Sequence, residues 1–178
     1  LPVAAAQSAE HGPVSEWRLE LSWSAQELRE IDIVPAVLGL TNQIRALKAH
    51  QGVLFLMLSE LYNNALDHGL LGLDSSRKDL EGGFEDYLAQ RAERLAELTH
   101  GRIDIILHLH MEDDLAVLDI TLADSGPGFD FNGYLACMAE PDPDGKHYHG
   151  RGISLVRQLS MAVAYSGTGN RVWARYKL

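Results

Sequence analysis

A strongly apolar stretch with helical periodicity, residues 54–69, constrains the fold of this chain more than any other segment. Apolar residues three or four positions apart predict a helix with one face packed on a core. The residues that recur at this spacing are Leu54, Leu58, Leu61 and Ala65. Gly69 follows them and is predicted to end the helix in a left-handed conformation.

The same helix carries polar residues that a purely structural helix would not need. Glu60 and Asn64 are four positions apart and share a second face, and Asp67 and His68 follow closely. Burying a carboxylate and an amide among apolar residues costs free energy unless each gains a partner. A bound metal ion and its ligand could be that partner. The alternative is a solvated polar run at the end of a helix.

Length and composition indicate one domain. The chain has 178 residues, of which 46% are hydrophobic, enough for a single well-formed core. Residues 1–13 are small, polar and unpatterned, so we expect a linker there and one domain over residues 14–178. The chain begins with Leu1 and not Met, which suggests a piece of a longer protein.

The net charge argues against some classes of binding partner, and the cysteine content bears on the cellular compartment. A formal net charge of −10 should repel nucleic acid and anionic lipid. The single cysteine, Cys137, excludes an internal disulfide. No apolar run is long enough to span a membrane and no signal peptide is visible, so we expect a cytoplasmic protein.

Alternating and helical patterns predict an α+β domain. The expected strands are residues 16–23 at a sheet edge, 103–110, 115–123, 161–165 and 171–178. Residues 111–114 should join the second and third strands as a hairpin. The expected helices are residues 32–50, the stretch with Glu60, an inserted helix at 81–99, a short helix at 131–138 and a helix beginning at 152. Residues 140–150 should form a mobile loop.

Asp124 stands where an apolar strand ends, and Gly126 and Gly128 follow it. The glycines let the backbone turn sharply and approach a ligand. A fixed carboxylate can accept a hydrogen bond from the exocyclic amine of adenine, whereas guanine would present a carbonyl there. The alternative is a plain turn after a strand.

Gly150, Arg151 and Gly152 precede a helical pattern. Free backbone N–H groups and the positive end of a helix dipole would then meet at one place, which suits a phosphate group. The alternative is flexibility at the entry to a helix. The segment is neither a Walker loop nor a dinucleotide-binding motif.

Taken in order, residues 60–69, 124–128 and 150–155 resemble the N box and the two glycine boxes of the GHKL superfamily of ATP-binding domains. A later Gly-Thr, at 167–168, is also similar. The resemblance covers the chain from about Trp17 to its end. It implies a two-layer α/β sandwich, with a mixed, mostly antiparallel sheet covered by about three helices.

The resemblance also implies residue roles, with ATP and Mg²⁺ as the cofactors. Asn64 would bind Mg²⁺ and Glu60 would act as general base, while Asp67 and His68 would lie near the metal waters or phosphates. Asp124 would bind the adenine amino group, with Gly126 and Gly128 passing over the base. The remaining implied contacts are phosphate binding by Gly150, Arg151 and Gly152, and a nucleotide contact by Thr168, although Gly169–Asn170 could take that last position instead.

Within the superfamily, the short lid and the Asn-Ala-x-x-His-Gly ending of the N box resemble the anti-sigma-factor serine kinases. The resemblance implies phosphorylation of a STAS-domain anti-sigma-factor antagonist, with an anti-sigma or sigma factor as a further partner. Related domains occur fused behind a receiver and a serine phosphatase. The alternatives are a nucleotide-dependent binding module without catalysis and the ATP-binding domain of a histidine kinase, for which His50 is the one candidate phosphoacceptor.

Two further features leave alternatives open. The inserted segment, residues 70–102, has an apolar stripe around Tyr87 and Leu95 that should pack on the domain or form a partner or dimer surface. The pairs His108/His110 and His147/His149 have the spacing of metal ligands, but we expect structural roles for them rather than a zinc site.

Overall fold

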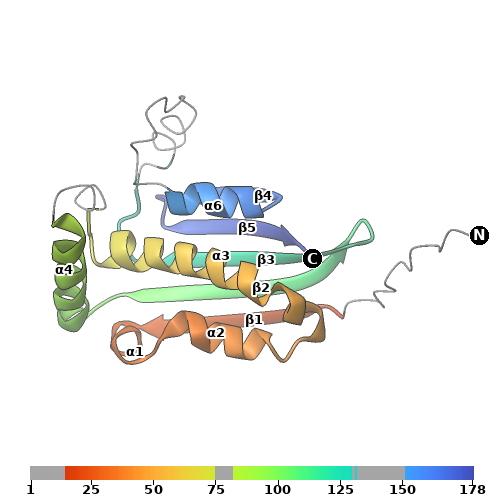
Figure 1. Ribbon diagram of the computed structural model, residues 1–178, viewed down its shortest axis with the longest axis horizontal. Coiled ribbons are helices and arrows are strands. Elements are labelled where there is room, and N and C mark those ends of the chain that lie inside the picture. The colour runs from red at the N-terminus through yellow and green to blue at the C-terminus, as the bar shows by residue number, and fades with distance from the viewer. Residues whose placement is uncertain (1–14, 75–81, 130, 132–150) are drawn as a thin grey trace, which may run out of the picture.

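The protein is an α+β sandwich in which helices lie on one face of a five-stranded sheet (Figure 1). The computed structural model describes residues 15–74, 82–129, 131 and 151–178. In spatial order the strands are β1 (Trp17–Ser24), β2 (Arg102–Glu112), β3 (Leu115–Asp124), β5 (Arg171–Lys177) and β4 (Ala162–Ser166). This confirms the expected fold class. All pairings among these strands are antiparallel, whereas the resemblance implied a mixed sheet.

The strands follow the predicted pattern closely. β1 lies at the edge of the sheet, and β2 and β3 form the predicted hairpin. The hairpin turns at Asp113 and Asp114, whose φ values of 47° and 64° are left-handed conformations that Asp tolerates better than most residues. Along β2, Ile103, Ile105, Leu107 and Leu109 are buried while the residues between them are partly exposed.

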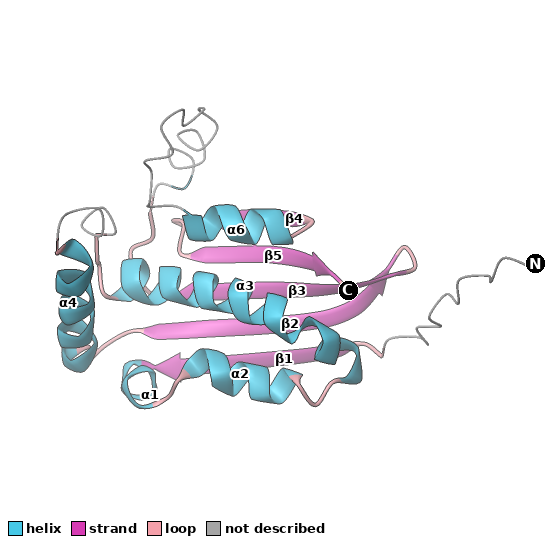
Figure 2. Ribbon diagram, in the orientation of Figure 1, coloured by secondary structure: helices cyan, strands magenta, loops and turns pink. Residues whose placement is uncertain are grey.

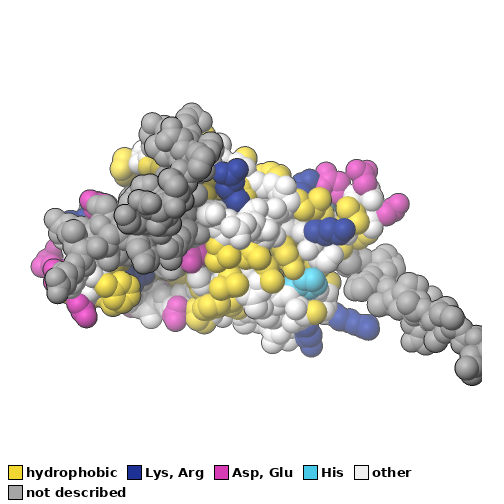
Figure 3. All heavy atoms as spheres, turned by 45° about the horizontal axis from the view of Figure 1, so that its top comes forward, with side chains coloured by type: hydrophobic (Ala, Val, Ile, Leu, Met, Phe, Trp, Pro, Cys, Tyr) yellow, Lys and Arg dark blue, Asp and Glu magenta, His cyan; other side chains and the backbone are white. Residues whose placement is uncertain are grey.

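Three helices cover one face of this sheet (Figure 2). They are α2 (Ile33–Thr41), α3 (Gln51–Asn63) and α6 (Arg151–Leu159). Their apolar faces and the inward-facing strand residues form a single core cluster. Hydrophobic side chains also remain on the outside of the helical layer (Figure 3), among them Leu40 and Phe55, each 48% exposed.

The predicted helix over residues 32–50 is wrong in extent. α2 ends at Thr41, whose hydroxyl donates to the carbonyl of Leu38 at 3.0 Å, and residues 45–50 form a separate 3-10 helix, η1 (Arg45–His50). Side-chain bonds of this kind compete with continued α-helix. The sequence reading also missed α1 (Ala25–Glu30), which a capping box between Ser24 and Glu27 begins.

The predicted inserted helix is present as α4 (Gly83–Glu97) and stands across one end of the sheet (Figure 1). The linker at residues 1–13 and the loop at 140–150 lie outside the described residues, as does all of the short helix at 131–138 except Phe131. Within the described ranges, no helix is long and apolar enough to cross a membrane.

Candidate functional site

The helix that carries Glu60 does not end as predicted. α3 continues without a break into a π-helix, η2 (Asn64–Leu70), and the N–H of Leu71 donates to the carbonyl of Leu66, five residues back, at 2.8 Å. Gly69 lies inside this wider turn and its φ is not positive, so the predicted left-handed terminator is wrong. π-Helical turns often occur at functional sites because they redirect the backbone.

A glycine is needed at position 69 for a different reason, because the chain there lies very close to Asp124. A Cβ atom there would lie 2.5 Å from both Cγ and Oδ1 of Asp124, and a Cβ atom on Gly126 would overlap the carbonyl oxygen of Gly69. Only hydrogen fits at either position. The glycine segment after β3 is therefore packed directly on the end of the long helix.

The carboxylate of Asp124 is fixed by its neighbours. Its Oδ1 accepts the N–H of Gly126 at 2.8 Å. The backbone of Asp124 is held by the turn before β5, because its N–H donates to the carbonyl of Asn170 at 2.9 Å and its own carbonyl accepts from Nδ2 of Asn170 at 2.9 Å. Burial raises the pKa of the Asp124 carboxyl above its ordinary value, and the bond from Gly126 partly offsets this.

The turn between β4 and β5 contacts the same glycine segment. Gly128 has a φ of 81°, and a Cβ atom on it would lie 2.6 Å from Oγ1 of Thr168. Thr168 therefore sits against Gly128 while Asn170 braces Asp124, so both candidate pairs in this turn touch the segment. The sequence offered Gly169–Asn170 as an alternative for the nucleotide contact, but the bonds of Asn170 to the backbone of Asp124 were not predicted.

Glu60 lies against Gly152, in the last of the three segments that the sequence analysis singled out. α3 packs on α6, and a Cβ atom on Gly152 would lie 3.0 Å from Cδ of Glu60 and would overlap its Oε2. The carboxylate thus lies over the first turn of α6, where the helix dipole favours a negative charge. Gly150 and the side chain of Arg151 lie outside the described residues.

Asn64, one turn beyond Glu60, has an unsatisfied amide. Its Nδ2 is buried and has no hydrogen-bond partner among the described residues. The oxygen and nitrogen of an Asn amide are assigned from their partners, so an unpartnered position can be either one. A buried amide next to a carboxylate fits the oxygen ligands that Mg²⁺ prefers.

Asp67 has partners of its own in the inserted helix. It is 5% exposed, and its two carboxylate oxygens accept from the hydroxyl of Tyr87 and from Nε of Arg91, each at 2.7 Å. Arg94 donates to the carbonyls of Leu71 and Gly72 in the same region. These bonds fasten α4 to the end of the long helix.

The apolar stripe of α4 packs in part on this domain. Tyr87 is 3% exposed and Leu95 packs against the core cluster, whereas Phe84 and Leu88 of the same helix are 57% and 47% exposed. Packing on the domain is therefore confirmed, and a partner or dimer surface stays a prediction. Two histidines are also engaged: Nδ1 of His68 lies 2.7 Å from the carbonyl of Leu73, and Nδ1 of His50 lies 2.7 Å from the hydroxyl of Tyr176.

One end of the long helix therefore meets both glycine segments, through Glu60 and Gly152 on one side and Gly69 and Asp124 on the other. The arrangement places a half-buried carboxylate, an amide nitrogen without a partner among the described residues and a helix N-terminus around the same helix. Neither a scan against protein-family models nor a search of curated proteins found a match to this chain.

Proposed function

We propose that this protein is an ATP- and Mg²⁺-dependent protein-serine kinase that acts on a STAS-domain anti-sigma-factor antagonist in the cytoplasm. The observation that carries the proposal is the meeting of both glycine segments at one helix end, at Gly152 and at Asp124. A nucleotide needs a polar partner for its base and a cluster of N–H groups for its phosphates. This helix end brings one candidate for each together.

Asp124 is the proposed partner of the adenine amino group. Its carboxylate is held by Gly126 and its backbone by Asn170, so an incoming base finds the acceptor already in position. Because the site is partly desolvated, the bond from the base should be worth more than the same bond in water.

The first turn of α6 is the proposed phosphate site, since its backbone N–H groups have no helical partners. The carboxylate of Glu60 lies over this turn, so the phosphates would bind beside it. Asn64 would hold Mg²⁺ through its amide oxygen. When bound, the metal ion would neutralise charge on the phosphate oxygens.

Glu60 is the proposed general base. In this role its carboxylate accepts the proton of the attacking serine hydroxyl as the oxygen bonds to the γ-phosphorus and the bond to the β-phosphate oxygen breaks. Its place one turn from Asn64, over the start of α6, supports this role.

The test compares Glu60→Gln with the unchanged protein in phosphate transfer and in nucleotide binding. We expect transfer to fall by about 100-fold or more, with nucleotide binding retained. Glu97→Gln, an exposed position on α4, is the control. Unchanged transfer in Glu60→Gln would reject Glu60 as the base, and nucleotide binding without transfer in the wild type would favour the binding module.

The acid stability of the transferred phosphate distinguishes the proposed serine kinase from the histidine-kinase alternative. Phosphoserine and phosphothreonine survive acid, whereas phosphohistidine does not. His50, the sequence candidate for a phosphoacceptor, is hydrogen-bonded to Tyr176 and partly buried, which favours a structural role. An acid-labile label on this chain would contradict the proposed serine kinase.

A further inference from the structure

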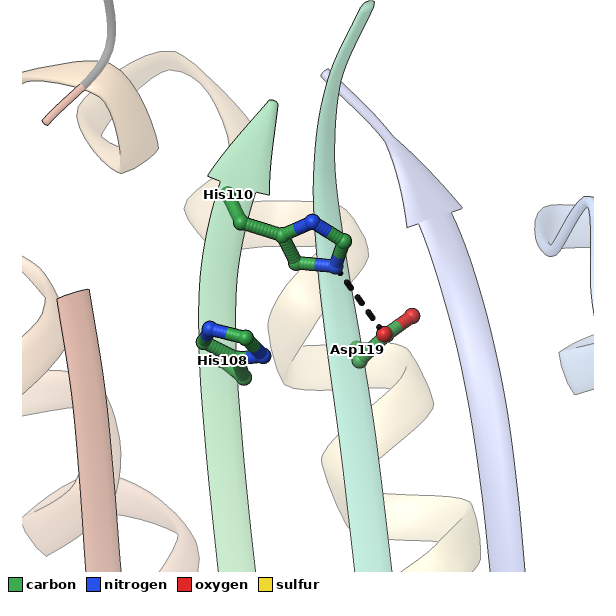
Figure 4. A group of neighbouring side chains, drawn as sticks. All are labelled: His108, His110 and Asp119. Atoms are coloured by element: carbon green, nitrogen blue, oxygen red, sulfur yellow. Dashed lines mark hydrogen bonds and ion pairs between the residues drawn. The ribbon is translucent and has the colours of Figure 1, made fainter. Parts of the chain in front are cut away.

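We propose that the helix-free face of the sheet carries a site for a divalent transition-metal ion, with His108, His110 and Asp119 as its ligands (Figure 4). One ring nitrogen of each histidine and one carboxylate oxygen of Asp119 lie within 4.8 Å of one another. Two imidazoles and a carboxylate form a ligand set that suits Zn²⁺ and its neighbours in the first transition series.

The hairpin brings these ligands together. His108 and His110 are two residues apart on β2, so they project from the same face, and their rings stack with centroids 4.5 Å apart. Asp119 on β3 pairs directly with His108. A hairpin centred on Asp113 and Asp114 dictates this register, so the third ligand could have been found from the sequence.

His110 is oriented as a metal ligand would be. Its Nδ1 lies 3.4 Å from the carbonyl oxygen of Met111, and its Nε2 lies 3.1 Å from Oδ2 of Asp119. Both neighbours are acceptors, but a neutral imidazole has only one N–H. If Nδ1 donates to the carbonyl, as ligand histidines commonly do, the lone pair of Nε2 faces a carboxylate oxygen. A cation between these two atoms resolves the conflict.

The distances allow a metal ion after small side-chain movements. Tetrahedral zinc with bonds of about 2.0–2.1 Å holds its ligand atoms about 3.4 Å apart. Nε2 of His110 and Oδ2 of Asp119 need to separate only slightly from their 3.1 Å. A ring nitrogen of His108 lies within 4.8 Å of the other two ligand atoms, and its χ2 torsion is soft enough to allow the remaining movement.

The local charge also suits a divalent cation. Asp119 accepts two bonds from Arg175, at 2.7 and 2.8 Å, and Arg175 also pairs with Glu112. Glu16 pairs with Nε2 of His108 at 3.0 Å. With neutral imidazoles, this bonded network has three carboxylates and one guanidinium, which leaves two negative charges. Glu16 is largely exposed and can turn in as a fourth ligand.

Calorimetric titration of Zn²⁺ into the full chain, with excess Mg²⁺ present to fill oxygen-only sites, tests the proposal. We expect one Zn²⁺ per chain. His108→Gln should weaken binding at least about tenfold, as should Asp119→Asn. Among the described residues, the His108 side chain pairs with the exposed carboxylate of Glu16 and stacks on His110, so its replacement should leave the fold intact, which circular dichroism checks.

Two control variants show whether Zn²⁺ binds at the proposed ligands or at other histidines. His100→Gln, at an exposed histidine in the loop before β2, should bind Zn²⁺ as tightly as the wild type. So should the double variant His147→Gln/His149→Gln, which removes the second histidine pair in the sequence. No zinc uptake by the wild type, unchanged affinity in His108→Gln, or loss of binding in the His147/His149 variant would each overturn the proposal.

Discussion

The carboxylate of Glu60 lies so close to Gly152 that a methyl group on that glycine would overlap Oε2. The overlapping atom is the end of a flexible side chain and not part of the backbone. A larger residue at position 152 can therefore be accommodated by moving the carboxylate away, which removes from the start of α6 the very group that the proposed chemistry uses.

Gly152→Ala should thus reduce function with little loss of stability. We expect phosphate transfer to fall at least about tenfold, because the proposed base is displaced, and the melting temperature to change little. The control is Gly52→Ala on α3, where no atom lies within 4 Å of the new Cβ. A Gly152→Ala protein with full transfer activity would contradict the role given to this contact.

Gly126→Ala, unlike Gly152→Ala, should reduce the stability of the folded protein. Its Cβ would overlap the backbone carbonyl of Gly69, which cannot move aside cheaply, so we expect a loss of about 1–3 kcal/mol in unfolding free energy. Gly39→Ala, in open space on α2, should instead gain about 0.5–1 kcal/mol. Urea unfolding of both variants measures the difference, and equal stabilities would show that Gly126 is not sterically required.

Asp124→Asn should stabilise the nucleotide-free protein while weakening its selectivity. Because burial raises the native pKa of Asp124, the folded state holds the proton more tightly than the unfolded chain does. The wild type should therefore lose stability relative to the variant as pH rises from about 3.9 through the raised native pKa. Thermal unfolding of both proteins across this range measures the effect.

The same variant tests the adenine contact. The wild type should bind ATP well over GTP, and Asp124→Asn should lose this preference together with much of its affinity. Calorimetry with both nucleotides gives the comparison. Equal binding of ATP and GTP by the wild type would remove Asp124 from the proposed site.

Arg91→Ala should loosen the inserted helix. Arg91 donates to the buried carboxylate of Asp67, and bonds to charged groups contribute about 1.5–3 kcal/mol each, so we expect a loss of that size. Glu93→Ala, at an exposed position of α4, is the control and should change stability by less than about 0.5 kcal/mol. Faster hydrogen exchange confined to α4 in Arg91→Ala would confirm the local effect, and unchanged exchange would reject it.

The sequence predicted the helices and strands that depend on residues close to one another along the chain. Alternation in the strands follows from one buried sheet face, and the polar turn at 111–114 determines the hairpin and its register. The strands and the hairpin depend on residue type and spacing alone. The expectation that Glu60, Asp124 and Gly152 share one site came instead from the family resemblance, and the structure places Gly152 against Glu60 and Asp124 against Gly69.

The features that the sequence did not predict depend on contacts between distant segments. The partners of Asp67 come from α4, 20 and 24 residues later in the chain, and no periodicity signals them. The π-helical turn places Gly69 directly against Asp124, which is a contact between distant segments. The end of α2 is a local exception, because the buried hydroxyl of Thr41 donates to the carbonyl of Leu38 in its own helix.

The π-helical turn makes chain length itself critical between Asn64 and Leu70. Deleting one residue there would let the ordinary α-helix resume, and each residue of an α-helix corresponds to a rotation of about 100°. Gly69 would then face a different direction, and its carbonyl would no longer lie under Gly126. A single insertion or deletion in this span should therefore disturb the contact with Gly126 even where every side chain is kept.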